Sequence, residues 1–223
     1  MYIIMMGAPG SGKGTISTSI CEEFNLEHLA TGDIFREEIK NQTELGQKAN
    51  EYISKGLLVP DEITIAMVEG KLDQLPNGAV LDGFPRTISQ AESLKKYLAS
   101  KGQSITAVIM LDVPDKDIIT RTASRVICSN KSCGASYNTI FMPSKVEGIC
   151  DKCGSELIKR KDDEPETIKA RLVTYHNETE PVIEYFREEG LLEAIPIDIY
   201  SPTTREDTTL ESFKRIRNRN NKE

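Results

Sequence analysis

The 223-residue chain contains no tryptophan, only two histidines, and 6% aromatic residues. It also lacks an excess of positive charge, because 28 Lys and Arg face 35 Asp and Glu and leave a formal net charge of −7. Proteins that bind nucleic acid or anionic membranes broadly usually present a strongly basic surface. The acidic balance therefore argues against both kinds of partner, and the scarcity of aromatic side chains leaves little for stacking on bases.

Long hydrophobic runs are absent as well. The apolar start, from Met1 to Met6, is too short for a signal peptide or a membrane-spanning helix, and no Lys or Arg precedes it. We therefore expect a cytoplasmic protein that does not bind membranes. In that compartment, the five cysteines are more typical of metal ligands or buried thiols than of disulfides.

Short apolar segments alternate with stretches of helical periodicity, which predicts an α/β fold with a parallel sheet flanked by helices. The length fits one domain with insertions better than two equal domains. The basic end, from Lys214 to Lys222, is interpreted as a frayed helical tail. The expected strands cover residues 2–6, 26–30, 79–81, 106–111 and 192–197, and the expected helices cover 13–24, parts of 31–73, 88–100, 114–125, 165–188 and 205–218.

Between residues 126 and 159 the helical periodicity stops, and cysteines and glycines take its place. Cys128-x4-Cys133 and Cys150-x2-Cys153 are separated by 16 residues. Four thiolates at these spacings fit a tetrahedral zinc ion, with iron as the alternative metal. They leave no open coordination position, and so short a segment cannot build its own hydrophobic core. The metal is therefore predicted to be structural. Cys21, in the first expected helix, is interpreted as a buried thiol.

A glycine-rich segment, residues 7–15, follows the first expected strand and opens the first expected helix. Its sequence is Gly-Ala-Pro-Gly-Ser-Gly-Lys-Gly-Thr. Glycines let the backbone approach phosphates closely, and a helix N-terminus adds partial positive charge. Lys13 supplies a full positive charge for the β- and γ-phosphates. Gly14 stands where Ser or Thr follows the lysine in the common Walker A pattern, and Thr15 comes one position later.

This variant loop resembles that of adenylate kinases, and four further motifs follow in order. They are Thr31-Gly32-Asp33 with Arg36, Asp82-Gly83-Phe84-Pro85-Arg86-Thr87 with Gln90, the arginines 121, 125, 160 and 171, and Lys161-Asp162-Asp163. The cysteine insertion resembles the lid of the long-lid, zinc-binding bacterial-type branch. The resemblance implies a P-loop NTPase-type core (residues 1–30, 61–125 and 160–223), a helical AMP-binding insertion (31–60) and a zinc-binding lid (126–159).

The implied activity is reversible, Mg-dependent transfer of the terminal phosphoryl group of ATP to AMP, giving two ADP, by a monomer. Arginine suits such a site because its planar fork binds phosphate oxygens bidentately and stays charged. The resemblance implies catalytic roles for Lys13, Arg86, Arg125, Arg160 and Arg171. It implies ATP contacts from Gly10, Ser11, Gly12, Lys13, Gly14, Thr15, Arg121, Arg125, Ser136 and Tyr137. It implies AMP contacts from Thr31, Arg36, Leu57, Leu58, Val59, Gly83, Phe84, Pro85, Arg86, Gln90, Arg160 and Arg171.

The acidic residues receive separate interpretations. Asp82, at a strand end, resembles the residue that orients the waters of Mg²⁺, which prefers to keep waters and to bind substrate phosphates. Asp33 is expected to cap a helix, and Asp162 and Asp163 to make contacts that close the lid. The attacking AMP oxygen is already ionised at pH 7, so no general base is needed, and His28 and His176 are interpreted as structural or surface residues. Ser124 stands where the family often has glycine.

Two alternatives stay open at this point. The first is the same fold with another donor such as GTP, which a comparison of turnover with ATP and GTP would distinguish. The second is a nucleotide-binding regulatory module whose zinc knuckle binds nucleic acid, although the acidic charge argues against it. That module also gives no reason for Arg36, Arg86, Arg160 and Arg171. For the phosphotransferase that the resemblance implies, closure of the lid over ATP and of the AMP-binding insertion over AMP is expected, because phosphoryl transfer to water must be prevented.

Overall fold

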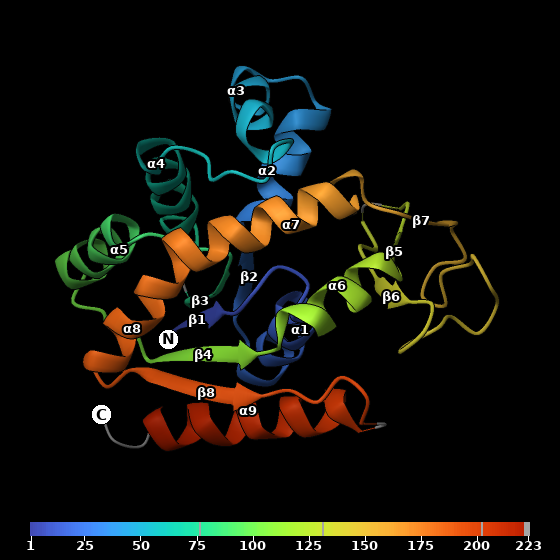
Figure 1. Cartoon of the computed structure of the whole chain (residues 1–223). Helices are drawn as coiled ribbons and strands as arrows, with labels where there is room; N and C mark the ends of the chain where they lie inside the picture. The colour runs from blue at the N-terminus through green and yellow to red at the C-terminus, as the bar shows by residue number, and fades with distance from the viewer. Residues whose placement is uncertain (76, 131, 202, 221–223) are drawn as a thin grey trace.

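The computed structural model describes residues 1–75, 77–130, 132–201 and 203–220. Its centre is a parallel sheet in the order β2-β3-β1-β4-β8 (Figure 1). Tyr2 lies opposite Ala79, and Ile3 lies opposite Ala107. The inner strands are almost fully buried, as expected for a parallel sheet covered on both faces. The strands are β1 (Tyr2–Met6), β2 (Glu27–Ala30), β3 (Ala79–Asp82), β4 (Ala107–Asp112) and β8 (Leu192–Pro196).

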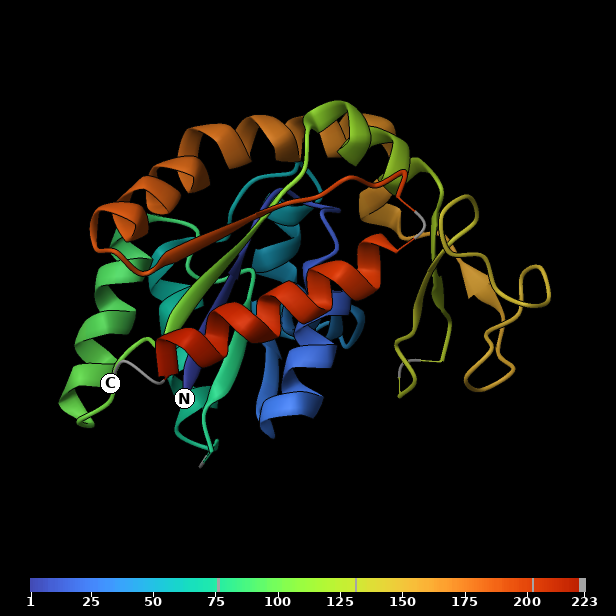
Figure 2. The ribbon, with the colours of Figure 1, turned by 90° about the horizontal axis from the view of Figure 1, so that it is seen from below.

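Helices cover both faces of this sheet and confirm the expected α/β architecture. Figure 2 shows the sheet between α7 and α8 on one side and α9 on the other. Side chains such as Ile3, Leu81 and Phe186 are fully buried in one continuous core between these layers. The covering helices are α1 (Lys13–Phe24), α4 (Asp61–Leu72), α5 (Ile88–Ser100), α6 (Asp115–Ala123), α7 (Pro165–Thr174), α8 (Glu180–Glu188) and α9 (Thr204–Asn220).

Two segments project from the sheet domain. Helices α2 (Thr31–Lys40) and α3 (Glu44–Ile53) pack on each other around Phe35 and Ala49. The second projection is a small antiparallel sheet at one end of the molecule (Figures 1 and 2). Its strands are β5 (Arg125–Cys128), β6 (Ser136–Asn138) and β7 (Leu157–Ile158), in the order β6-β5-β7.

The helix expected over residues 165–188 is interrupted. A π-helical segment, η2 (Tyr175–Thr179), separates α7 from α8, and the Glu180 N–H donates to the Tyr175 carbonyl. Pro181 follows directly and lacks the N–H that an uninterrupted α-helix would use. The wider turn removes that conflict, which is a recognised cause of π-bulges within long helices. A 3-10 turn, η1 (Lys161–Asp163), precedes α7.

The interpretation of the basic end as a frayed tail is wrong for its described part. Helix α9 continues to Asn220, and three of its arginines form ion pairs with the rest of the fold. Arg215 and Arg219 lie 2.8 and 2.7 Å from Glu193, and Arg217 pairs with Glu23. These partners come from distant parts of the chain, so only the folded structure reveals them. Residues 221–223 lie outside the described part.

Within the described residues, no helix combines the length and the hydropathy that crossing a bilayer requires.

Candidate active site and metal centre

The glycine-rich loop leaves β1 at a topological switch point. The neighbours of β1 are β3 and β4, so the chain leaves the middle of the sheet at its carboxyl edge, where α/β proteins bind ligands. Gly7, Gly10 and Gly12 have φ angles of +133°, +87° and +100°. A Cβ on Gly7 would lie 2.6 Å from the Leu111 carbonyl oxygen. The loop therefore requires glycine both for its conformation and for space.

Lys13 is the first residue of α1, directly after this loop. Its Nζ donates to the carbonyl oxygens of Gly7 and Ala8 at 2.8 and 2.9 Å. Burial lowers the pKa of Lys13 to about 8, although the nearby Asp82 carboxylate opposes the shift. An anion bound in the loop would supply the stabilisation that burial removes.

Asp82 ends β3 and faces the start of α1. Its Oδ2 lies 3.5 Å from His28 Nε2 and 3.4 Å from the point where a Cβ on Gly14 would stand. Burial raises the pKa of Asp82, but His28, Lys13 and Arg86 together outweigh burial and lower it below its usual value. The group is therefore an ionised carboxylate beside the loop. His28, interpreted from the sequence as a structural or surface residue, is a direct neighbour of this carboxylate.

Two adjoining hollows open beside the loop. The loop hollow, of about 530 Å³, is lined by Lys13, Pro85 and Tyr175 among others. The distal hollow, of about 590 Å³, extends between α2, α4 and the chain after β3, and Thr31, Arg36 and Gln90 line it. The two hollows share five lining residues, which are Gly56, Leu58, Gly83, Arg86 and Arg171. Two arginines thus stand where the hollows meet.

The arginines around the distal hollow are held by carboxylates and carbonyls of the protein. Arg36 lies 2.5 Å from Asp33 and 3.5 Å from Asp162, and Arg171 lies 3.2 Å from the same Asp162. The Arg86 Nε donates to the Gly83 carbonyl at 2.8 Å. Asp162 is thus a protein anion between two cations, in a hollow that a phosphate could occupy.

Arg160 completes this cationic group. Burial, reinforced by the charges of Arg36 and Arg125, lowers the pKa of Arg160 to about 10. Burial also lowers the pKa of Arg171 to about 10, although Asp162 opposes the shift. The buried Arg160 Nε finds no hydrogen-bond acceptor within the part of the chain that the structure describes. Cations that are buried and close to one another create a strong local preference for anions.

Two more arginines lie where the chain enters the small antiparallel sheet, Arg121 in α6 and Arg125 at the start of β5. The Arg121 guanidinium covers the loop, where its Nη1 donates to the Ser11 carbonyl at 3.3 Å. The Arg125 Nε donates to Asp163 Oδ2 at 2.8 Å, and its Nη2 pairs with Asp163 Oδ1. The adjacent Asp162 and Asp163 therefore contact different arginines.

The side chains of Phe84 and Tyr137 pack away from the two hollows, and the helix cap predicted at Asp33 is absent. Phe84 is 1% exposed and packs in the core, so its ring does not line either hollow. Asp33 does not cap α2, because the helix begins at Thr31 and Asp33 lies within its first turn, paired with Arg36. The Tyr137 side chain points into the cysteine cluster. Across the described ranges, no hydrogen bond joins Ser136 or Tyr137 to the glycine-rich loop.

Three threonines that line the hollows were not predicted from the sequence. Thr174 and Thr179, from the end of α7 and from η2, line the loop hollow, and Thr64 of α4 lines the distal hollow. Thr174 Oγ1 donates to the Gly56 carbonyl at 2.9 Å and so joins α7 to the turn after α3. No sequence motif marks these threonines. Thr174 and Thr179 reach the loop hollow only because α7 and η2 pack across the sheet.

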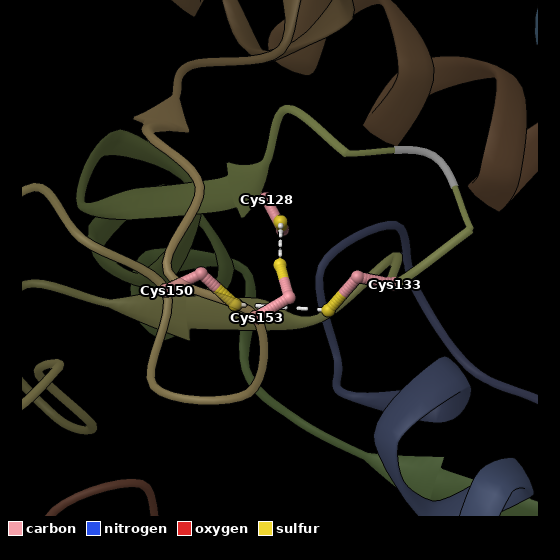
Figure 3. Close-up of side chains that lie close together, drawn as sticks. All are labelled: Cys128, Cys133, Cys150 and Cys153. Atoms are coloured by element: carbon pink, nitrogen blue, oxygen red, sulfur yellow. Dashed lines mark hydrogen bonds between the residues drawn. The ribbon is translucent and has the colours of Figure 1, made fainter.

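The four cysteines of residues 126–159 form one cluster (Figure 3). Their Sγ atoms all lie within 4.8 Å of one another, with Cys128 to Cys153 at 3.4 Å and Cys133 to Cys150 at 3.7 Å. All are free thiols, as is Cys21, which is half-buried against the core. Zn–S bonds of about 2.3 Å in a tetrahedron place sulfurs roughly 3.8 Å apart. The observed spacing fits such a site.

Polar groups and burial shift the pKa values of the cluster in opposite directions. The hydroxyl and the N–H of Ser155 lower the pKa of Cys153 to about 6, whereas burial raises the pKa of Cys128 to about 12. The Tyr137 hydroxyl accepts from the Asp151 N–H at 2.8 Å and lies 3.5 Å from Cys150 Sγ, to which it can donate. Gly134 and Gly154 have positive φ angles and follow directly on Cys133 and Cys153, where the chain turns tightly.

Comparison with known proteins agrees with this site. The profile of the family described as "Adenylate kinase" matches residues 5–191. A protein named adenylate kinase from Caldicellulosiruptor saccharolyticus is 52% identical over 209 residues, which cover 92% of this chain and 96% of that protein. Another from Lachnoclostridium phytofermentans is 54% identical over 197 residues, which cover 87% and 90% of the two chains.

A third protein of the same name, from Caldicellulosiruptor bescii, is 49% identical over 218 residues, or 97% of this chain and 99% of that protein. The matches thus extend from the glycine-rich loop through both projecting segments. With the glycine-rich loop, the paired hollows and the arginines between them, they establish that this chain belongs to the adenylate kinase family.

Proposed function

We propose that this member of the adenylate kinase family binds ATP over the glycine-rich loop and AMP in the distal hollow, and transfers the terminal phosphoryl group directly between them. The observation that carries the proposal is the junction of the two hollows at Arg86 and Arg171. A phosphoryl group that moves between the hollows passes these two guanidinium groups. Their shared position favours direct transfer over two unrelated binding sites.

Charge neutralisation is the main task of the residues at this junction. Phosphoryl transfer leaves little covalent chemistry to the protein, so catalysis depends on positioning and on stabilising developing charge. Lys13 and Arg125 would hold the donor phosphates, Arg36 and Arg86 the AMP phosphate, and Arg160 and Arg171 the group in transit. Mg²⁺ bound with ATP would add charge neutralisation at the donor phosphates, with its waters oriented by Asp82. No histidine acts as a base in this scheme.

Among the described residues, none of those that line the loop hollow comes from the small antiparallel sheet, and Figure 2 shows this sheet at one end of the molecule. We infer that residues 126–159 are a lid that closes over ATP, and that residues 31–60 close over AMP. Arg121 and Arg125 lie at the start of the lid, and closure would bring its β6 strand towards the donor. Compaction in small-angle scattering with a bisubstrate inhibitor tests this, and an unchanged radius of gyration would contradict it.

We infer that the lid holds zinc through Cys128, Cys133, Cys150 and Cys153. The sulfur spacing and the lowered pKa of Cys153 support this assignment. The metal would stabilise the lid fold and take no part in the transfer, since four thiolates leave no position for water or substrate. Metal analysis of the purified chain distinguishes zinc from iron.

The chain would act as a monomer, because one chain supplies the lining of both hollows. A cytoplasmic location would be typical of the family. Light scattering coupled to gel filtration, with and without nucleotides, tests the monomer, and a stable dimer would contradict it.

The decisive experiment measures ADP formation from ATP plus AMP, and from ATP alone. We expect fast turnover that requires AMP, because closure on both substrates excludes water from the phosphoryl group. The matched variant Lys13→Met keeps the length of the side chain and removes its charge. It should lower kcat by about 10²- to 10³-fold, the usual effect of losing one charge-stabilising donor.

Three other outcomes would redirect the proposal. ATP hydrolysis that does not depend on AMP would mean a general NTPase and would remove the AMP-site assignments. Faster turnover with GTP than with ATP would reassign the donor. Retention of single-stranded RNA in a filter-binding assay would favour the regulatory module.

A further inference from the structure

Gln90 is held from both ends of its amide. It is 2% exposed, lies in the first turn of α5 and lines the distal hollow. Its Oε1 accepts from the Arg86 backbone N–H at 2.7 Å, and its Nε2 donates to Asp61 Oδ1 at 2.7 Å. The two contacts come from different parts of the fold, since Arg86 follows β3 and Asp61 begins α4.

Asp61 joins two segments that border the distal hollow. It follows directly on residues 57–60, and its Oδ2 accepts from Thr87 Oγ1 at 2.7 Å. Thr87 in turn caps α5 by accepting from the Gln90 N–H at 3.1 Å. Both oxygens of the Asp61 carboxylate are thus committed to the segment that carries Gln90.

These contacts permit only one orientation of the Gln90 amide. If the amide were reversed, its oxygen would face the Asp61 carboxylate and its NH₂ group would face the Arg86 N–H. Both pairs would be repulsive and would leave buried polar groups unsatisfied, which costs more than the bonds themselves contribute. Asp61 and the Arg86 N–H together therefore fix which end of the amide is the donor, and Asp61 is the only side chain of the two contacts.

The orientation matters because Gln90 keeps one N–H and one oxygen lone pair for a ligand. Adenine offers an N6 amino donor beside the N1 acceptor, whereas hypoxanthine offers an O6 acceptor beside an N1–H donor. A freely turning amide matches either base by reversing itself. An amide held by Asp61 matches only one of them.

We propose that Asp61 is a positioning residue that sets the base selectivity of the acceptor site by fixing the orientation of the Gln90 amide. The assignment rests on the proposed function, in which the distal hollow takes the acceptor nucleoside monophosphate. Asp61 does not line the distal hollow, so it would act on the base only through Gln90.

The test compares kcat/KM for AMP and for IMP, with ATP as donor, in the wild type and in Asp61→Ala. The wild type should prefer AMP by at least about tenfold, because a site built for one hydrogen-bond pattern rejects the inverse pattern. Asp61→Ala should lower this AMP/IMP ratio about tenfold and raise the KM for AMP. The KM for ATP should stay within about twofold. A loss of stability alone would lower both activities together and leave the ratio unchanged.

Three variants separate positioning from a structural role. In the Gln90→Ala background, Asp61→Ala should leave the ratio unchanged, because its effect passes through Gln90. Asp61→Asn keeps an acceptor for Gln90 Nε2 and an amide that can donate to Thr87 Oγ1, so it should restore most of the selectivity. Thr87→Val removes the cap and the other Asp61 contact, and should cost stability without changing the ratio. If Asp61→Ala fails to fold, Asp61→Ser replaces it, because serine suits a helix start but is too short to reach Gln90.

The possible failures differ. If the wild type does not phosphorylate AMP, the proposed function is refuted and this assignment falls with it. If the wild type phosphorylates AMP but Asp61→Ala or Asp61→Ser leaves the AMP/IMP ratio within about twofold, only the role of Asp61 is refuted. The same holds if the wild type does not discriminate between AMP and IMP.

Discussion

The sheet domain buries a continuous layer of aliphatic side chains, whereas the lid buries a cluster of Cys128, Cys150 and Tyr137. Ile140 and Val146 of the lid are 64% and 61% exposed. The hydrophobic effect is proportional to buried apolar area, so it stabilises the first region and contributes little to the second. The sheet domain therefore relies on packing, whereas the proposed metal at the four cysteines would supply most of the stabilisation of the lid.

Removal of the metal should give the largest difference between the two regions. A chelator is expected to unfold residues 126–159 and to leave the sheet domain folded, because metal binding supplies the folding free energy of so small a unit. Hydrogen exchange measured by mass spectrometry should show a loss of protection of 100-fold or more in the lid, as an order of magnitude. Cys21→Ser, outside the lid, is the matched control and should not change lid protection. Intact protection in a chain shown to be free of metal would remove the distinction.

A second comparison truncates one apolar side chain in each region. Leu81→Ala should lower the free energy of unfolding by about 2–5 kcal/mol, because Leu81 is fully buried in the core and leaves a cavity. Val146→Ala, on the exposed surface of the lid, should change it by less than about 0.5 kcal/mol. Urea denaturation of both variants measures the difference. Equal losses would mean that the lid depends on apolar packing after all.

Within the sheet domain, the lowered pKa of Lys13 makes ATP affinity depend on pH. Free Lys13, with a pKa of about 8, loses its proton as the pH rises above 8, whereas bound phosphates hold the proton on the amine. ATP binding should therefore take up protons at pH 8–9, and affinity should fall by up to about tenfold per pH unit above 8. Calorimetry in two buffers of different ionisation enthalpy measures the uptake. Lys13→Met should abolish it, and proton release would contradict the assignment.

The smallest expected effect lies at the contact between η2, which carries His176, and α6. His176 Nε2 lies 2.9 Å from Asp115 of α6, and Nδ1 lies 3.1 Å from Glu180. Asp115, aided by Glu180, raises the pKa of His176 above its usual value. A raised pKa stabilises the fold below about pH 6.5, and this contribution disappears as the pH rises through the folded-state pKa.

His176→Ala should thus destabilise the protein by less than about 1 kcal/mol at pH 5.5 and have almost no effect at pH 8.5, since the pair is partly exposed. Denaturant titrations at the two pH values test this. A cost that is the same at both would show that the ring acts by packing alone.

The glycine-rich loop could be predicted from the sequence because its conformation is local. The glycines, the lysine and the helix start lie within nine residues, and positive φ angles at Gly10 and Gly12 require glycine whatever surrounds them. The cysteine cluster was equally accessible, because ligand spacing along two short turns sets the sulfur positions. In both cases the information lies in neighbouring residues.

Other features depended on partners that are distant in the chain. The interpretation of Asp33 as a helix cap failed because α2 begins two residues earlier, and the carboxylate is paired with Arg36 instead. The Tyr137 side chain packs among the cysteines, which its place in the sequence did not indicate, and its contact with ATP stays a prediction. The arginines of α9 were read as a frayed tail because their acidic partners, such as Glu193, lie on other elements. Pro181 is visible in the sequence, but the π-helical turn before it was not predicted, because a proline can equally end a helix.

The sequence by itself determined the elements with local chemistry, namely the glycine loop, the cysteine knuckles and the buried strands. It could do so because backbone conformation and ligand spacing are properties of short segments. Only the tertiary structure decided how Arg86 and Arg171 come to stand between two hollows, and how Asp61 meets Gln90. These contacts depend on the order of the strands and on the packing of α4, α5 and α7, because parallel crossovers bring distant residues to one edge of the sheet.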